Sequence, residues 1–388
     1  MAVTGWLANL TLVAYIAAVQ IQIIVSLSVS GFHPPTWQAP LIAIGITVIA
    51  ILCNTFLIRK MAFLEGACLM LHISGFMFVN VLLILLGPRQ DVAPTLTTFG
   101  LVGESYTHLG LTCLVGLGVP LTTTLGADSS CYLAEEVRNA SWAVPRAMIA
   151  STMANAITGL IITTNLVFNI SNMYAAMNPT NILTYVTILL DATESRAATY
   201  YVVSLLTALF TACATNRATT ASRQLYAFAR DNGLPFSKWL SHVRPGSDLP
   251  LNSILAALLL SVVPTFIIVE TDTAIQIISN IAVNGLVLSY FTAIVVFMYR
   301  KIRSPKSLPH ATFSMGRIIG LVVNSFALIF LTLAFVFCFF PTGPDPTLLH
   351  MNWSVVVMGL VLVFCLLYWV LRARHNYIAP IERMRKDL

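Results

Sequence analysis

The chain has 388 residues, and its composition excludes a soluble globular protein. Hydrophobic residues make up 57% of it and charged residues only 9%, whereas about a quarter of the residues of soluble domains are charged. The mean hydropathy of +0.84 agrees. Because so few polar groups cannot cover that much apolar surface in water, lipid is expected to be the solvent for much of the chain. The composition therefore predicts an all-α, polytopic membrane protein.

The net charge of +6 does not indicate a nucleic-acid partner, because the charged residues lie in short connections between apolar runs and not along one face of a domain. The seven cysteines all lie inside apolar stretches. None has the spacing of metal ligands, and an odd number does not suggest a disulfide framework. They are expected to be small buried side chains, and we expect no metal and no other cofactor.

Ten apolar stretches are each long enough to cross a hydrocarbon core of about 30 Å, which needs roughly 20 helical residues. In chain order they are 6–30, 39–58, 64–86, 108–134, 146–170, 198–225, 251–269, 274–299, 316–340 and 352–372. The first is too long for a signal peptide and lacks a basic flank and a cleavage site, so it is expected to be a true span. The longest polar connections are 87–107, 171–197, 226–250 and 300–315.

The distribution of Lys and Arg predicts the orientation of these spans. With the N-terminus inside, the inner connections and the tail hold eighteen of the 21 basic residues, and the outer loops hold only Arg89 and Arg196. This asymmetry places both termini in the cytoplasm, with 373–388 as a cytoplasmic tail. Five tryptophans near predicted span ends are expected to be interfacial anchors, and these are Trp6, Trp37, Trp142, Trp353 and Trp369.

The fourth stretch, 108–134, is long for a straight crossing and carries Gly116, Gly118 and Pro120, followed by Gly126-Ala-Asp-Ser-Ser. Gly and Pro favour non-helical backbone, and Asp after Gly is a good helix N-cap. We predict a helix that ends near Leu125, a short unwound stretch and a second half-helix from about Asp128. Such breaks form binding sites in transporters, because free N–H groups meet an anionic group there. The alternative is a simple kink in which Asp128 serves as a buried cap.

Two long segments carry a resemblance to a known family. Residues 126–147 read GADSSCYLAEEVRNASWAVPRA, residues 220–239 read TASRQLYAFARDNGLPFSKW, and a third, weaker match is MNWS at 351–354. These segments resemble the signature of amino acid/polyamine/organocation permeases, specifically the fungal amino acid, GABA and choline permeases. The resemblance covers essentially the whole chain as one permease domain, 1–388. It implies a LeuT-like inverted-repeat transporter fold of twelve spans, with the first and sixth unwound at the substrate site.

Aligned on these motifs, the chain supplies the family's third to twelfth spans, since its first residues, 1–6, fall where the third span begins. The glycine-rich first span, which would provide half of the substrate site, has no counterpart. We therefore expect either a fragment or a short form. The chain as written is expected to insert correctly but to show no saturable uptake until a relative's first two spans are added at Met1.

The resemblance also implies site residues. Gly126, Ala127 and Asp128 correspond to the unwound part of the sixth span, and we take them with Ser129 and Thr122 as substrate-binding candidates. Thr122 stands where many relatives have an aromatic lid, so it is not expected to act as one. Three charged residues correspond to the inner end of that span and are expected to steady a gate: Glu135, Glu136 and Arg138.

Polar residues inside predicted spans are further candidates, because a charge near mid-bilayer costs about 2.5–3.5 kcal/mol on insertion scales. In related proteins the region of Arg217 holds either sodium or a fixed cation, and Arg217 would be that cation; alternatively it extends to the inner interface near Arg223. His72 either carries coupling protons or makes a hydrogen bond between helices. Asn280 and Asn284 share a helix face and are expected to join helices by hydrogen bonds.

These features together predict a secondary active transporter of amino acids or related amines (the GABA, choline and polyamine class). It would be proton-coupled, work by alternating access and lie in the plasma membrane. The alternative is a non-transporting permease-like membrane protein, either a truncated fragment or a nutrient sensor. An enzyme is not expected, because Gly-x-Ser-x-Gly, His-Glu-x-x-His and paired membrane aspartates do not occur, and neither does a Walker motif.

Overall fold

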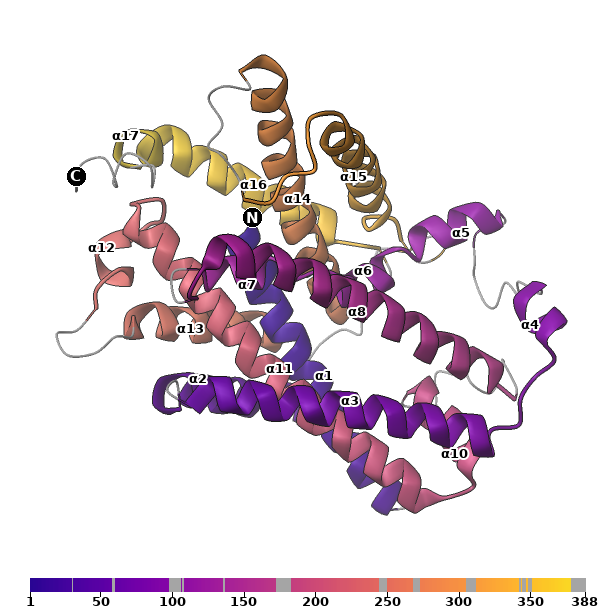
Figure 1. Cartoon of the computed structure of the whole chain (residues 1–388). Coiled ribbons are helices and arrows are strands. Elements are labelled where there is room, and N and C mark those ends of the chain that lie inside the picture. Colours follow the sequence, from indigo (N-terminus) through magenta and orange to yellow (C-terminus); the bar gives the residue numbers. More distant parts are fainter. Residues whose placement is uncertain are drawn as a thin grey trace. The chain divides into compact units, whose positions relative to one another are not determined.

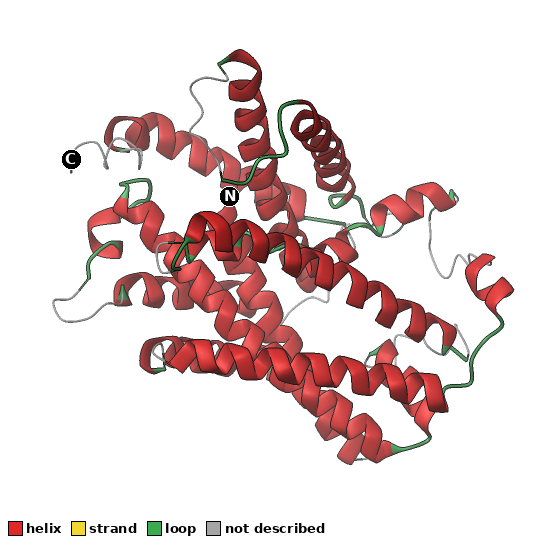
Figure 2. Ribbon diagram, in the orientation of Figure 1, coloured by secondary structure: helices red, strands yellow, loops and turns green. Residues whose placement is uncertain are grey.

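A computed structural model describes most of the chain. The described residues are 1–29, 31–57, 60–97, 106, 108–134, 137–171, 183–243, 250–267, 273–304, 312–341, 343, 347 and 351–377. Within them all regular secondary structure is helical and no strand occurs (Figures 1 and 2). The prediction of an all-α chain is confirmed.

Each of the ten predicted spans is a helix or a series of helices. The long helices are α1 (Ala2–Ser28), α2 (Gln38–Phe56), α3 (Met61–Leu86), α8 (Ala140–Phe168), α11 (Arg196–Arg230), α13 (Leu251–Ile267), α14 (Thr273–Arg303), α15 (Ile318–Phe337) and α16 (Ser354–Tyr368). The π-helical η3 (Trp369–Ala373) and α17 (Arg374–Asn376) continue α16, and the fourth span consists of α5 (Leu109–Val115), α6 (Gly118–Thr124) and α7 (Ser129–Tyr132). In the described residues nine stretches are long and apolar enough to cross a membrane, and α13 is a shorter apolar helix.

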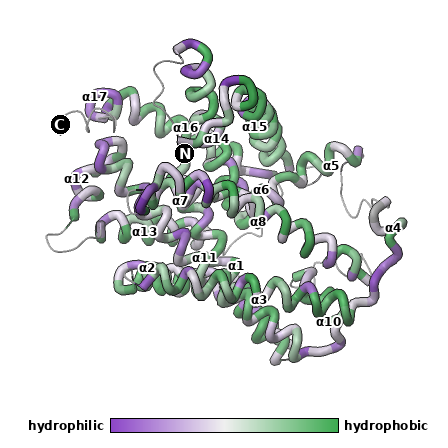
Figure 3. Tube along the Cα trace, in the orientation of Figure 1, coloured by the Kyte–Doolittle hydropathy of each residue, from purple (hydrophilic) through white to green (hydrophobic). Residues whose placement is uncertain are grey.

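The long helices expose large apolar side chains over much of their surface. Figure 3 shows apolar residues along most of the length of these helices. None of the residues of α8 is buried, and α15 exposes Ile318, Val322, Phe326 and Ile329 on one side. In water such faces would aggregate, whereas in a bilayer they contact lipid tails. The chain is therefore an integral, multi-pass membrane protein.

Two connections that the sequence predicts as polar loops contain helices. Connection 87–107 includes α4 (Val92–Thr97), and connection 171–197 includes α10 (Thr184–Thr193). α10 packs against α3, and Val186, Leu189 and their neighbours are buried on its inner face. Apolar residues spaced three apart form one stripe of a helix, and the surrounding polar residues hide this stripe in an average taken over the whole connection.

The chain divides by its internal contacts into two compact units. The first consists of Met1–Leu12, Gly110–Thr152 and Arg217–Leu388, and the second of Val13–Leu109 and Met153–Asn216. Each unit has its own apolar core, as expected for a compact unit.

The core of the first unit joins α1, α6, α11, α14 and α15. One cluster holds Trp6, Ala221 and Leu286, and another is formed by Leu121, Val283, Val287, Leu331, Ala334 and Cys338. α1 and α14 approach closely at two glycines, because a Cβ on Gly285 would lie 2.8 Å from the Cα of Gly5. Small residues at helix crossings allow such close packing in membrane proteins. This crossing brings the start of α1 beside α14.

The core of the second unit combines apolar packing with amide hydrogen bonds. Leu83, Leu189 and Val202 are buried together. Asn165 donates from Nδ2 to Asn80 Oδ1 at 3.1 Å and so joins α8 to α3. Hydrogen bonds of this kind between spans hold membrane helices together.

Candidate functional site

The helix of the fourth span is broken at Gly126. The backbone of Leu125 is extended, with φ −74° and ψ 152°, after a last helical bond from its N–H to Leu121 O. Gly126 has φ +112°, a conformation that residues with a Cβ rarely adopt. The chain becomes helical again at Ser129, with Asp128 in the N-cap position. The predicted end near Leu125 and the predicted restart near Asp128 are both confirmed.

Two details of the fourth span differ from the prediction. α7 ends at Tyr132, and Glu135 and Glu136, the predicted gate residues, lie outside the described residues. A second interruption at residues 116–117 separates α5 from α6, where one continuous helix was predicted. Pro120 explains it, since it has no N–H to donate to the carbonyl of Gly116 four residues earlier and its ring crowds that carbonyl.

Asp128 is a buried hydrogen-bond acceptor and not a helix cap. Its side chain is 8% exposed and makes no capping hydrogen bond to α7. Instead, Oδ2 accepts from Trp6 Nε1 at 3.2 Å and from the Tyr132 hydroxyl at 2.9 Å, and Oδ1 accepts from the Tyr290 hydroxyl. The Tyr132 hydroxyl in turn accepts from Gln224 Nε2 at 2.8 Å. The carboxylate therefore ties together α1, α7 and α14, and through Tyr132 also α11.

Trp6 is fully buried, so its predicted role as an interfacial anchor is wrong. Its exposed fraction is 0%, because its indole N–H donates to Asp128 and its ring packs against Leu286. A tryptophan in the first turns of an apolar helix is typical of an anchor, and the distant acceptor leaves no sign in the local sequence. The other four predicted anchors are exposed in the structure: Trp37, Trp142, Trp353 and Trp369.

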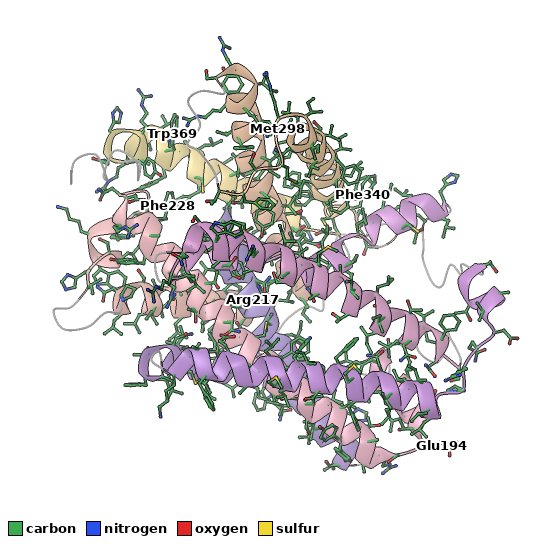
Figure 4. All side chains as sticks on the ribbon, in the orientation of Figure 1. Glu194, Arg217, Phe228, Met298, Phe340 and Trp369 are labelled. Atoms are coloured by element: carbon green, nitrogen blue, oxygen red, sulfur yellow. The ribbon has the colours of Figure 1, made fainter. Side chains whose placement is uncertain are left out.

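Arg217 lies on α11 beside the break, and Figure 4 labels it there. Its Cζ is 4.9 Å from the centroid of the Trp6 ring, within the range of a cation–π contact. Its Nη1 would lie 2.8 Å from a Cβ added to Gly126. Its Nε is buried without a hydrogen-bond partner. The break thus has a carboxylate and a guanidinium beside it, both in contact with Trp6.

The remaining predicted site residues lie as follows. Ser129 donates its backbone N–H to Gly126 O at 3.1 Å, and Ala127 O accepts from a neighbouring serine hydroxyl. Thr122 lies on α6 and donates its hydroxyl to Val119 O at 2.6 Å, so its oxygen bonds to its own helix. His72 belongs to the second unit, and its side chain is exposed on α3.

Asn284 is the most unusual polar residue of α14. It is fully buried, yet neither its Nδ2 nor its Oδ1 has a hydrogen-bond partner in the part of the chain that the structure describes. The predicted hydrogen bond between helices is therefore wrong for Asn284. A hydrogen bond between helices of the kind predicted for Asn284 is instead formed in the second unit, by Asn165 and Asn80.

Sequence reasoning missed four partners in the site: Trp6, Tyr132, Tyr290 and Gln224. The spacing of Tyr132, four residues after Asp128, could have indicated a contact on one helix face. Tyr290 is 162 positions from Asp128, and no local pattern relates the two. Among the described residues no group of three or more His, Cys, Asp or Glu could hold a metal ion.

Comparison with known proteins identifies the family. The model of the amino acid permease family matches residues 1–363. The chain belongs to the amino acid permease family. This confirms the resemblance carried by the two long motifs, and because permeases are transport proteins, it also confirms that the chain is not an enzyme.

Three relatives show the range of named permeases that resemble the chain. A putative amino acid/polyamine transporter of Macrophomina phaseolina is 27% identical over 323 residues, which cover 82% of this chain and 70% of that protein. Amino-acid permease 2 of Neurospora crassa is 26% identical, with 88% and 62% covered. The choline transporter of Saccharomyces cerevisiae is 24% identical, with 80% and 55% covered. This permease thus spans between about half and seven tenths of the length of these relatives.

Proposed function

We propose that this permease is a secondary transporter of amino acids or related amines, and that its substrate binds at the break formed by residues 126–129. The break itself is the observation that carries the proposal. It leaves the backbone N–H groups of Ala127 and Asp128 without hydrogen bonds among the described residues, inside an otherwise apolar span. Polar backbone at membrane depth is tolerated where it lines a cavity or a binding site.

The charges beside the break support substrates that carry an amine. A carboxylate has about four acceptor positions. In Asp128, three of these positions accept hydrogen bonds from Trp6, Tyr132 and Tyr290. One position is left for an ammonium group. The names of the relatives, which include an amino acid permease, an amino acid/polyamine transporter and a choline transporter, agree with this class.

The guanidinium of Arg217 supports proton coupling and not sodium coupling. A fixed positive charge beside the break repels a sodium ion there, because like charges at short distance in a medium of low dielectric repel strongly. Arg217 would then fill the role of the coupling cation permanently. His72 stays a candidate for the proton path.

We further propose that the permease lies in the plasma membrane with both termini in the cytoplasm. The proposal rests on the excess of Lys and Arg in alternate connections. It makes 373–388 a cytoplasmic tail. The first residues of this tail complete the π-helical end of the last span and α17, and residues 378–388 lie outside the described part.

Uptake into proteoliposomes tests the proposal. Radiolabelled GABA, lysine and choline are offered under an inward proton gradient, with potassium or sodium as the external cation. Uptake is measured for this chain and for a second chain that carries a relative's first two spans before Met1. Saturable uptake that increases with the proton gradient and does not depend on sodium is expected of the extended chain. Strict sodium dependence would reject the role of Arg217, and no uptake by either chain would favour a non-transporting sensor.

A further inference from the structure

Arg217 carries a positive charge that no residue in the described part of the chain neutralises. A guanidinium has five N–H donors, and neither a hydrogen bond nor an ion pair to Arg217 is found among the described residues. The Trp6 ring and Gly126 lie close to its guanidinium. Charged groups inside membrane proteins are normally paired. The guanidinium of Arg217 is therefore suited to bind an anion that comes from outside the chain.

Asp128 does not serve as that anion. Its carboxylate forms no ion pair with Arg217, and its oxygens accept from Trp6, Tyr132 and Tyr290. Trp6 holds both charged groups, because its N–H donates to Asp128 and its ring face lies against the guanidinium. The two charges are thereby fixed beside the break without being joined to each other.

Gly126 allows the guanidinium to lie directly against the break. A Cβ at this position would lie only 2.8 Å from Arg217 Nη1 and 3.2 Å from Trp6 Cη2. The side chain of any other residue would therefore collide with the guanidinium of Arg217 and the ring of Trp6. Arg217 as a whole is half-buried, although its Nε is fully buried. An anion bound at the unwound segment would therefore lie beside the N–H donors of Arg217.

We propose that Arg217 binds the carboxylate of a zwitterionic substrate at the Gly126 break. The guanidinium presents paired N–H groups that match the two oxygens of a carboxylate. The inference rests on the proposed function and narrows its substrate class. The permease selects amino acids, GABA among them, over choline and polyamines, which have no carboxylate to place on Arg217.

Matched pairs of ligands test this selectivity. Binding to the purified chain in lipid nanodiscs is measured by titration calorimetry for GABA against n-propylamine and for lysine against cadaverine, each pair differing by one carboxylate. The wild type is expected to bind the amino acid of each pair about ten- to a hundredfold more tightly, as one charge-assisted contact would give. Arg217→Gln should abolish this difference.

Two variants serve as controls. Arg230→Gln removes the same charge from the end of the same helix, where Arg230 contacts Asp231 at 3.9 Å, and should leave the difference unchanged. Arg217→Lys keeps the charge but loses the paired donors, and should retain part of the difference. If Arg217→Gln does not fold, as thermal unfolding would reveal, Arg217→Lys decides the question: a preference equal to that of the wild type would overturn the proposal.

The remaining outcomes separate this inference from the proposed function. Equal binding of both members of each pair by the wild type, or an unchanged preference in Arg217→Gln, overturns the role of Arg217 alone. Potassium chloride that stabilises the wild type but not Arg217→Gln, with GABA and n-propylamine bound equally, would assign Arg217 to an inorganic anion and also overturn it. Failure of all four ligands to bind, both to this chain and to the chain that carries a relative's first two spans, would reject the proposed function together with this inference.

Discussion

At the scale of single residues, Asp128 shows how a local pattern can predict a position and still miss its role. Gly126 and Asp128 were found from sequence because glycine favours left-handed backbone and aspartate favours helix starts. The position at the break follows from these preferences. The role does not, because two of the three donors to Asp128 are 122 and 162 positions away along the chain. The separation of 122 positions between Trp6 and Asp128 also explains why the sequence around Trp6 wrongly predicts an interfacial anchor.

Asp128→Asn is expected to destabilise the permease. An amide has one acceptor oxygen where the carboxylate has two, so at least one of Trp6, Tyr132 and Tyr290 loses its acceptor in a buried site. The cost of one unsatisfied buried donor is about 1–3 kcal/mol. Thermal unfolding in detergent, followed by tryptophan fluorescence, should show a lower midpoint for the variant.

The control for this measurement is Asp191→Asn. Asp191 accepts one hydrogen bond, from the Ser171 hydroxyl at 3.0 Å in an exposed position, so its replacement should hardly change the midpoint. If Asp128 were only a helix cap, asparagine would be nearly as good. An Asp128→Asn variant that unfolds at the wild-type temperature would restore that interpretation.

At the scale of helices, the sequence predicted the spans well and their interruptions partly. A run of about 20 apolar residues has few alternatives to a membrane helix. The observed helices therefore lie at the apolar runs that the sequence predicts as spans. Gly116 and Pro120 do not by themselves predict the break between α5 and α6, because a proline in a membrane span often only bends the helix. α10 was missed because its apolar residues lie in a connection that is polar on average.

Helix ends carry the evidence for orientation. The last turn of α14 holds Arg300, Lys301 and Arg303, and that of α11 holds Arg230. With 35 residues, α11 is about 52 Å long at 1.5 Å per residue, longer than the hydrocarbon core. Its basic end is therefore expected to extend beyond the membrane on the cytoplasmic side.

Cysteine accessibility in intact cells tests this orientation. On a background without reactive cysteines, an impermeant thiol reagent should label Gln90→Cys, in a connection that we propose to be external, at once. Ser304→Cys, directly after α14, should react only after the cells are permeabilised. Labelling of Ser304→Cys in intact cells would show that the orientation is the reverse of the proposed one.

At the scale of the whole molecule, family membership and the helix pattern agree, and the composition alone had already excluded a soluble protein. The substrate is a different matter. The named relatives include an amino-acid permease, a choline transporter and a polyamine transporter, so the fold alone does not identify the solute. The charges and backbone groups at the break are the features of this chain that narrow the choice.

Protection of a thiol placed at the break tests most directly whether substrate occupies it. Ala127→Cys on a background without the seven native cysteines is treated with a water-soluble thiol reagent in nanodiscs, with and without GABA, lysine, choline or putrescine. Gln90→Cys, exposed in a loop, serves as the matched control. We predict that GABA and lysine slow the labelling at position 127 in a saturable way and leave position 90 unaffected. Equal labelling rates at position 127 with and without every one of these solutes would contradict the account.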